Sequence, residues 1–220
     1  MMPCWKGGNG AAAVDNHSDT EGSLIDLVIK WDVAIPQLSG DTPRRAYIYL
    51  PASYEREPER RYPVMYMFDG HNVFFDEDAT YGKSWGMNKC MEESGKELII
   101  AAVECNHEGN SRLSEYAPFS FENSELGKIK GRGLVCMKWL IGTFKPYVDA
   151  NYRTLPDRCN SIIAGSSMGG LMALYGATTF NHVFQRAACL SPSLWIAPGK
   201  TLEMVARAKI RRDTCIYLDY

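Results

Sequence analysis

Features that would direct the chain to a membrane or to nucleic acid are missing from its sequence. No apolar stretch approaches the roughly 20 residues of a membrane-spanning helix, and residues 1–22 lack the apolar segment of a secretory signal. The formal net charge is only −2. The basic run at 128–132 has no interleaved aromatic residues, so a solvated loop before a helix is its better interpretation. We therefore expect a cytoplasmic protein without nucleic-acid or membrane partners.

Cysteine pairs and clusters of metal ligands are missing as well. The seven cysteines are irregularly spaced and form no C-x-x-C pair, which favours a reducing compartment over a disulfide framework or a zinc site. Cys189 and Cys215 lie in apolar runs, so we expect both in the core. His107 offers one ligand for an adventitious metal, but no second ligand pair has metal-site spacing. The sequence thus predicts neither a metal nor a cofactor.

What the chain does contain is material for one α/β domain. Of its 220 residues, 45% are hydrophobic and 23% are charged, and we expect a loose tail over 1–22 and one domain over 23–220. Strands are expected at 24–33, 45–50, 63–68, 98–103, 161–164, 186–190 and 215–218, and helices at 85–95, 133–145, 170–177 and 201–209. The second helix should end before Pro146. Hairpins followed by alternating strands and helices predict a mostly parallel central sheet flanked by helices.

The most informative segment is Gly165-Ser166-Ser167-Met168-Gly169, which lies between an expected strand and an expected helix. A G-x-S-x-G turn in this position is typical of a nucleophile elbow, in which Ser167 is the nucleophile. The glycines prevent crowding where the strand meets the helix. A phosphate-binding Walker loop is excluded, because Leu171 and Met172 stand where lysine and serine or threonine would be needed. A plain structural turn is the alternative.

Five segments, in family order, resemble those of the esterase D/enterochelin esterase group of α/β-hydrolases. They are D-G-H-N-V-F at 69–74, R-L-S-E-Y-A-P at 112–118, K-P-Y-V-D-A-N-Y-R-T at 145–154, G-S-S-M-G-G at 165–170 and S-P-S-L-W at 191–195. The resemblance spans about 24–220. It implies an α/β-hydrolase fold and a serine carboxylesterase that acts without a cofactor on a small-molecule or carbohydrate ester.

The resemblance also implies roles for individual residues. Ser167 would attack the ester, and the backbone N–H groups of Met168 and His71 would bind the oxyanion, in agreement with the general rule for this fold. The family commonly has glutamine where this chain has His71, and a backbone role survives that change. Trp195 and Tyr116 are candidates for the walls of the acyl or alcohol pocket, although large aromatic residues are often plain core.

The base of the expected triad is harder to find. In α/β-hydrolases the serine is followed by the acid and then by the histidine. The only histidine after Ser167 is His182, and it precedes Glu203, Asp213 and Asp219. In this order, the residues present cannot form the complete Ser-acid-His triad. Asp219 is a candidate acid, and its alternative role is that of a residue at a strand end.

By this resemblance, the turn with the family's acid, its last strand, the loop with its histidine and a final helix would follow Tyr220. We therefore expect a C-terminally truncated domain, impaired as an enzyme. His71 should lie near Ser167, yet we do not expect it to be the base, and His17 belongs to the tail. Acyl transfer to an alcohol or sugar, and a non-catalytic binding protein on a hydrolase scaffold, stay open as alternatives. The sequence does not indicate an oligomeric state.

Overall fold

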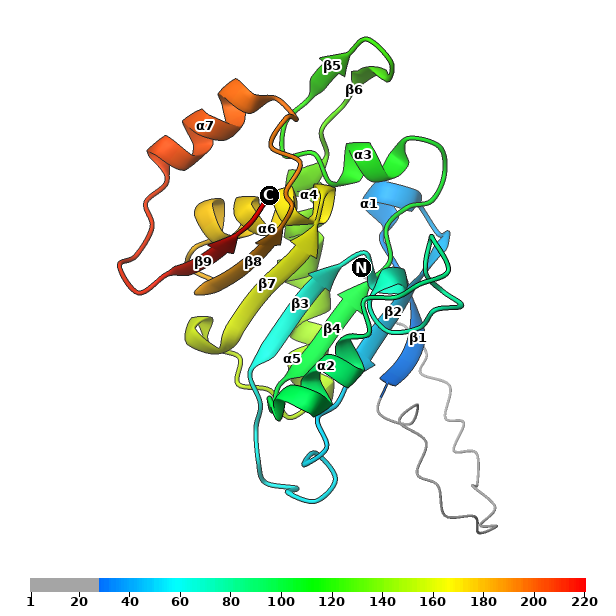
Figure 1. Ribbon diagram of the computed structural model, residues 1–220, viewed down its shortest axis with the longest axis vertical. Helices are drawn as coiled ribbons and strands as arrows, with labels where there is room; N and C mark the ends of the chain where they lie inside the picture. The colour runs from blue at the N-terminus through cyan, green and yellow to red at the C-terminus, as the bar shows by residue number, and fades with distance from the viewer. Residues whose placement is uncertain (1–27) are drawn as a thin grey trace, which may run out of the picture.

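A twisted seven-stranded sheet crosses the middle of the domain in the order β1-β2-β4-β3-β7-β8-β9 (Figure 1). The computed structural model describes residues 28–220, so the expected tail and the start of the first expected strand lie outside the described residues. The strands are β1 (Val28–Ala34), β2 (Pro43–Tyr49), β3 (Val64–Phe68), β4 (Ile99–Val103), β7 (Ser161–Ser166), β8 (Arg186–Leu190) and β9 (Cys215–Leu218). Only the β1–β2 and β2–β4 pairs of this sheet are antiparallel. The predicted mostly parallel sheet is confirmed.

Helices cover both faces of this sheet (Figure 1). One face carries α4 (Gly133–Trp139), the π-helical turn η3 (Leu140–Phe144), α5 (Lys145–Asn151) and α6 (Met168–Thr179), and the other carries α2 (Met87–Ser94). The short helices α1 (Pro36–Ser39) and α3 (Ser111–Glu115), and α7 (Pro198–Arg207), lie toward the end to which the parallel strands point. Within residues 28–220, no helix has the length and apolar character needed to cross a membrane.

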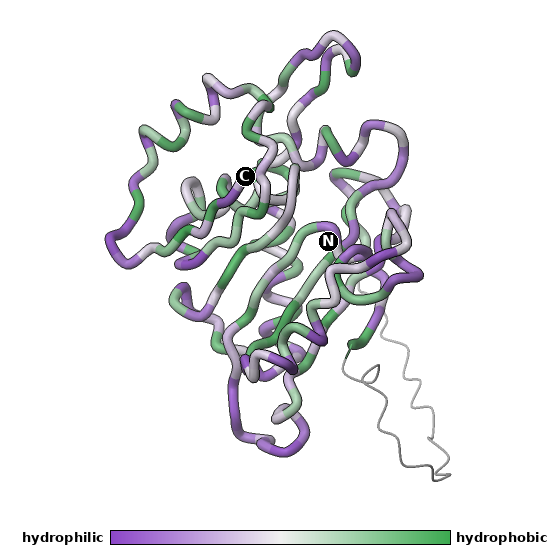
Figure 2. The backbone as a smooth tube through the Cα atoms, in the orientation of Figure 1, coloured by the Kyte–Doolittle hydropathy of each residue, from purple (hydrophilic) through white to green (hydrophobic). Residues whose placement is uncertain are grey.

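The two faces of β3 belong to two separate apolar clusters. Tyr66 and Phe68 pack with the helices α4 to α6, whereas Met67 packs with Met91 of α2. Side chains alternate between the faces of a strand, so a strand covered on both sides must be apolar throughout. Figure 2 shows the hydrophobic colour concentrated in the central strands and the hydrophilic colour in the outer loops. This explains why the continuous apolar run at 63–68 predicted the strand well.

The helix expected to stop before Pro146 continues through it, and this expectation was wrong. The chain stays helical from α4 through η3 to the end of α5 at Asn151. In η3 the N–H of Lys145 donates to the carbonyl of Leu140, five residues back. The wider turn shifts the hydrogen-bond register just before Pro146, which has no N–H to donate. A proline is tolerated there because it stands within the first two positions of α5.

Two smaller expectations were also wrong. Lys128 and Ile129, expected in a loop, lie in β6 (Gly127–Ile129), which forms a two-stranded hairpin with β5 (Phe121–Asn123). Strands this short leave no periodic signal in a sequence. Cys189 is fully buried as expected, but Cys215 is exposed, because β9 is the edge strand of the described sheet.

Phe144 should be one of the most costly side chains to truncate. It is 2% exposed and packs on Trp139, Trp31 and Tyr66, with ring centroids 5.4, 6.1 and 6.3 Å away. We expect Phe144→Ala to lower the free energy of unfolding by about 3–5 kcal/mol. Leu202→Ala on α7, where the side chain is 71% exposed, should change it by less than about 0.5 kcal/mol. Urea denaturation measures both, and equal costs would contradict this packing.

Candidate active site

Ser167 lies on the sharp turn that joins β7 to α6. Its φ of 57° and ψ of −117° are unusual for a residue with a side chain, and such a conformation costs on the order of 1–3 kcal/mol. Its N–H donates to the carbonyl of Leu190 at 2.9 Å, and its own carbonyl accepts from the N–H of Ser193 at 3.0 Å. These two bonds hold the strained backbone in place, with the side chain exposed.

The turn is possible only because two glycines meet in it. A Cβ atom on Gly165 would lie 2.5 Å from the carbonyl carbon of Gly169, far inside van der Waals contact. Gly169 in turn approaches the loop after β3, because its own Cβ would lie 3.3 Å from a carboxylate oxygen of Asp69. The elbow and the loop after β3 therefore pack directly against each other.

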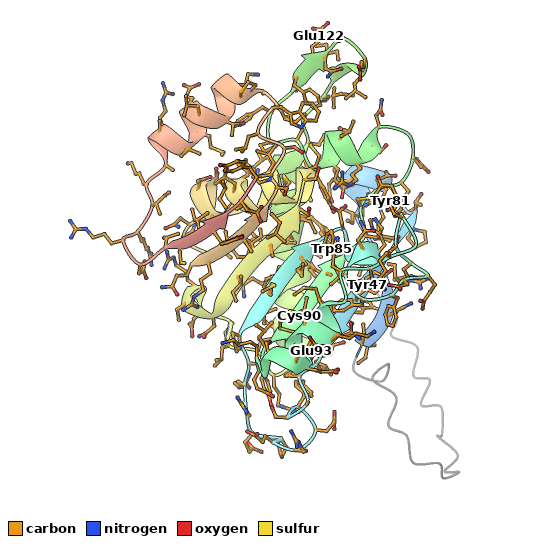
Figure 3. The ribbon with its side chains drawn as sticks, in the orientation of Figure 1. Tyr47, Tyr81, Trp85, Cys90, Glu93 and Glu122 are labelled. Atoms are coloured by element: carbon orange, nitrogen blue, oxygen red, sulfur yellow. The ribbon has the colours of Figure 1, made fainter. Side chains whose placement is uncertain are left out.

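A cavity of about 400 Å³ opens beside Ser167, at the ends of the parallel strands. Its lining comes from the loops after β3, β4 and β7, where ligands commonly bind in open α/β sheets. Tyr81 and Trp85, labelled in Figure 3, belong to the segment before α2 and also line it. Most of its other lining side chains are polar: Asp69, His71, Asn72, Thr80, Lys83, Asn106, His107, Arg112, Ser166 and Ser167.

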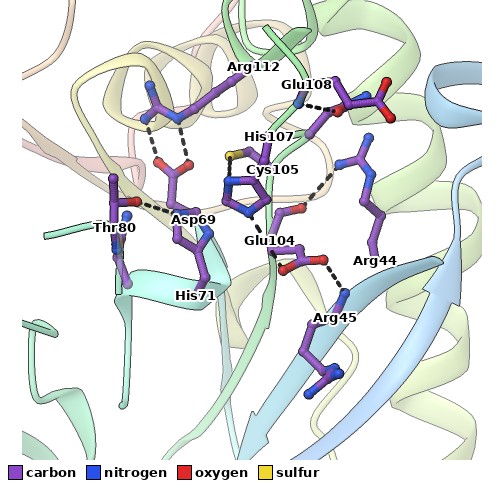
Figure 4. A network of polar contacts seen from close by, with 12 residues as sticks. Arg44, Arg45, Asp69, His71, Thr80, Glu104, Cys105, His107, Glu108 and Arg112 are labelled. Atoms are coloured by element: carbon purple, nitrogen blue, oxygen red, sulfur yellow. Dashed lines mark hydrogen bonds and ion pairs between the residues drawn. The ribbon is translucent and has the colours of Figure 1, made fainter. Parts of the chain in front are cut away.

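Asp69 holds the loop after β3 in position. The residue has a left-handed φ of 58°, and its carboxylate, 1% exposed, accepts two hydrogen bonds from Arg112 at 2.8 and 2.6 Å (Figure 4). Its N–H donates to the hydroxyl of Tyr116 at 3.3 Å. Asp69 thus has a structural role in this loop, and it joins the segment of Arg112 and Tyr116 to the elbow.

The two predicted oxyanion donors face no competing acceptor. His71 lies in the 3₁₀ turn η2 (Gly70–Asn72), and Met168 is the first residue of α6. Among the described residues, neither backbone N–H is assigned a hydrogen-bond acceptor. The first N–H groups of a helix have no partner within the helix, and they carry a partial positive charge. Neither group is therefore engaged by another backbone acceptor of the described chain.

No histidine among the described residues hydrogen-bonds to Ser167. Its Oγ instead lies 3.1 Å from the Oγ of Ser193, which is 5% exposed. His71 and His107 line the same cavity, whereas His182 lies at a different one, beside Thr178 and Arg207. Sequence reasoning gave Ser193 no role, because its contact with Ser167 depends on how the chain turns after β8.

The remaining predicted residues lie outside this cavity lining. Tyr116 is 2% exposed and packs edge-on against Phe68, with ring centroids 5.1 Å apart. It therefore contacts the loop after β3 from the core. Trp195 is 56% exposed and contacts Phe121 of the small hairpin. Asp219 accepts a hydrogen bond from the N–H of Ser191, next to the loop that carries Ser193. The roles predicted for Tyr116, Trp195 and Asp219 stay predictions.

Comparisons with known proteins agree with this fold. The sequence profile of the family described as "Putative esterase" matches residues 39–219. The chain is similar to the uncharacterized protein YbbA of Bacillus subtilis, with 22% identity over 69% of this chain and 58% of that protein. It is also similar to the iron(III) salmochelin esterase of Escherichia coli, with 30% identity over 47% of this chain and 26% of that protein. The matched regions thus span less than two thirds of both relatives.

A solved structure has a similar fold. The siderophore hydrolase EstA from Aspergillus nidulans superposes with a TM-score of 0.65 and 17% identity, over 89% of this chain and 67% of that chain. At this identity the likeness concerns the fold, which is the α/β-hydrolase fold that the motifs predicted. Because the family profile matches most of the chain, the protein belongs to this esterase family.

The pair of Asp69 and Arg112 gives a test of how the site is held. Arg112→Met leaves a buried carboxylate without its partner and should lower the free energy of unfolding by about 3 kcal/mol. Adding Asp69→Asn should recover part of this loss, since the uncompensated charge is then gone. As a control, Lys83→Met breaks the exposed pair with Asp76 and should cost less than about 1 kcal/mol. A double-mutant cycle by urea denaturation that gives no coupling energy would contradict this account.

Proposed function

We propose that the protein hydrolyses small-molecule esters, with Ser167 as its nucleophile. One observation carries the proposal. Ser167 is held in a strained turn with its hydroxyl exposed to a cavity. The N–H of Met168, next to Ser167, and the N–H of His71, in the loop packed against the turn, have no assigned acceptor. A purely structural turn gains nothing from such strain, whereas a nucleophile needs to be exposed and held in place.

The proposed reaction has two acyl-transfer steps. Ser167 Oγ bonds to the ester carbonyl carbon while the C=O π electrons move to the oxygen, and the hydroxyl proton passes to a base. The tetrahedral intermediate collapses, the C–O bond to the alcohol breaks, and the alcohol leaves with that proton. Water then attacks the acyl-serine in the same manner and releases the acid. Backbone donors placed where the oxyanion forms commonly contribute a hundredfold or more to the rate.

Within residues 28–220, no candidate base hydrogen-bonds to the Ser167 hydroxyl. The partner of the Ser167 hydroxyl is Ser193, and the described imidazoles make no hydrogen bond to it. Asp219, which directly follows β9, accepts a hydrogen bond from the N–H of Ser191, two residues before Ser193. It remains our candidate for the acid. Oxyanion hole and binding alone leave residual catalysis when a triad member is missing. An external base is therefore the appropriate means of testing Ser167.

The cavity supports a polar ester of modest size as substrate. A volume of about 400 Å³ is within the ordinary range for small-molecule sites. Arg112 is paired with Asp69 and Lys83 with Asp76, so the lining offers hydrogen-bonding groups more than net charge, which favours an ester with polar substituents. The names of two similar proteins, a salmochelin esterase and a siderophore hydrolase, make siderophore esters the first substrate class to test.

Acylation by p-nitrophenyl acetate tests the nucleophile directly. We expect intact-mass and peptide mass spectrometry to find one acetyl group on Ser167, formed faster when imidazole is added as an external base. Ser167→Ala should lower the acylation rate at least about 100-fold. Ser166→Ala tests the neighbouring serine of the same turn and should leave the adduct on Ser167.

A serine far from the cavity supplies the control. Ser94→Ala, at the end of α2, should acylate like the unchanged protein. Circular dichroism confirms that each variant is folded. Acetyl groups distributed over several residues, or equal acylation of the Ser167→Ala variant, would refute the proposal. So would the lack of any adduct at high imidazole concentration.

A further inference from the structure

His71, Cys105 and His107 converge on the wall of the cavity although they come from two different loops. Phe68 at the end of β3 pairs in parallel with Val103 at the end of β4. His71 follows Phe68 by three residues, and Cys105 and His107 follow Val103 by two and four. Adjacent parallel strands therefore deliver the three side chains to one place, as Figure 4 shows. No spacing within either loop reveals this arrangement.

We propose that these three side chains form a binding site for a zinc ion. Their candidate ligand atoms all lie within 4.8 Å of one another, and Cys105 Sγ lies 4.0 Å from His107 Nδ1. With Zn–N bonds of about 2.0 Å and Zn–S bonds of about 2.3 Å, tetrahedral ligands lie about 3.5 Å apart. Ligand atoms that lie 4.8 Å apart would have to approach each other by about 1.3 Å to bind one ion. The expectation of no metal rested on spacing along the sequence, and spacing does not apply across two loops.

The two histidines are oriented as metal ligands usually are. His71 Nε2 lies 3.1 Å from the hydroxyl of Thr80, while its Nδ1 is buried without a partner among the described residues. His107 Nε2 lies 3.7 Å from the carboxylate of Glu104, and its Nδ1 faces Cys105. A metal-bound imidazole typically gives its second nitrogen to such an oxygen. In each ring, Nδ1 is then the nitrogen available to the ion.

Without a bound ion, the buried polar atoms of His71 and Cys105 reduce the stability of the folded protein. Cys105 is 1% exposed and His71 is 4% exposed, yet the His71 Nδ1 finds no hydrogen bond and the sulfur has only a weak, long one. A buried polar atom without a partner typically costs about 1–3 kcal/mol. An ion satisfies both atoms together. His107, with its side chain 54% exposed, connects the group to the solvent of the cavity.

The chemistry of the three side chains suits a zinc ion. Burial, together with the neighbouring carboxylate of Asp69, raises the pKa of the Cys105 thiol, and burial lowers the pKa of His71 to about 4. Without an ion, both groups are therefore neutral near pH 7. On binding, the S–H bond breaks, the sulfur electron pair forms the Zn–S bond and the proton leaves to solvent. The thiolate and two imidazoles form a donor set that favours zinc over magnesium or calcium.

Because the proposed zinc site lies on the cavity wall, a bound ion would also shape the cavity beside Ser167. All three side chains line the cavity beside Ser167, so the remaining coordination position of a tetrahedral ion faces that cavity. The ion also fixes the side chain of the residue whose N–H we propose as an oxyanion donor. The zinc proposal itself does not depend on Ser167 being a nucleophile, and binding is measured without any activity assay.

Cobalt(II) in place of zinc is the probe. After treatment with EDTA and desalting, the full chain should bind one Co²⁺ and show the near-ultraviolet thiolate-to-cobalt absorption together with the strong visible bands of a tetrahedral site. Zinc should displace it with 1:1 stoichiometry. We expect Cys105→Ser to abolish the thiolate absorption and His107→Gln to weaken binding at least tenfold. Because His107 is exposed, its variant stays informative if Cys105→Ser fails to fold.

Matched variants exclude other ligands. Cys90→Ser on α2, where Figure 3 shows the residue, and His182→Gln should leave the spectrum and the stoichiometry unchanged. Replacement of both Cys4 and His17, which precede the described residues, should do the same. Absence of binding at 100 μM cobalt or zinc, binding without the thiolate absorption, or binding that survives both Cys105→Ser and His107→Gln would each overturn the proposal.

Discussion

Between Gly165 near the end of β7 and Gly169 in the first turn of α6, the backbones approach so closely that a Cβ atom would lie 2.5 Å from its neighbour. This contact lets the chain reverse within three residues and forces Ser167 to a positive φ. The position of the hydroxyl and the free N–H at the start of α6 both follow from this turn. The bonds of Ser167 to Leu190 and Ser193 stabilise a conformation that serine rarely adopts.

The second constraint is the buried carboxylate of Asp69. It lies against Gly169, and its two hydrogen bonds to Arg112 connect the loop after β3 with the segment after β4. A buried charge of this kind is stable only while it is paired, so both loops must keep their places around the elbow. The backbone of His71 and the side chains of the proposed zinc site therefore depend on one ion pair, although they serve different chemistry.

Local patterns in the sequence predicted the parts of the structure that local physics decides. The G-x-S-x-G turn, the apolar run at 63–68 and the strand at 186–190 carry their own signals, and the structure has all three elements. The continuation of the helix past Pro146 depends on the π turn just before it, which the spacing of apolar residues in the sequence does not reveal. The contact of Ser167 with Ser193, and the convergence of His71 with Cys105, depend on strand register and loop path. Such features require the folded chain.

The central claim is that Ser167 is a nucleophile placed between two backbone donors, and a crystal structure of its organophosphate adduct tests this most directly. After reaction with a diethyl phosphate ester, we expect one phosphoryl group on Ser167 Oγ. Its phosphoryl oxygen should lie about 2.7–3.1 Å from the backbone nitrogens of both His71 and Met168. A phosphoryl oxygen that points to solvent, or an adduct on another residue with Ser167 unmodified, would contradict the account.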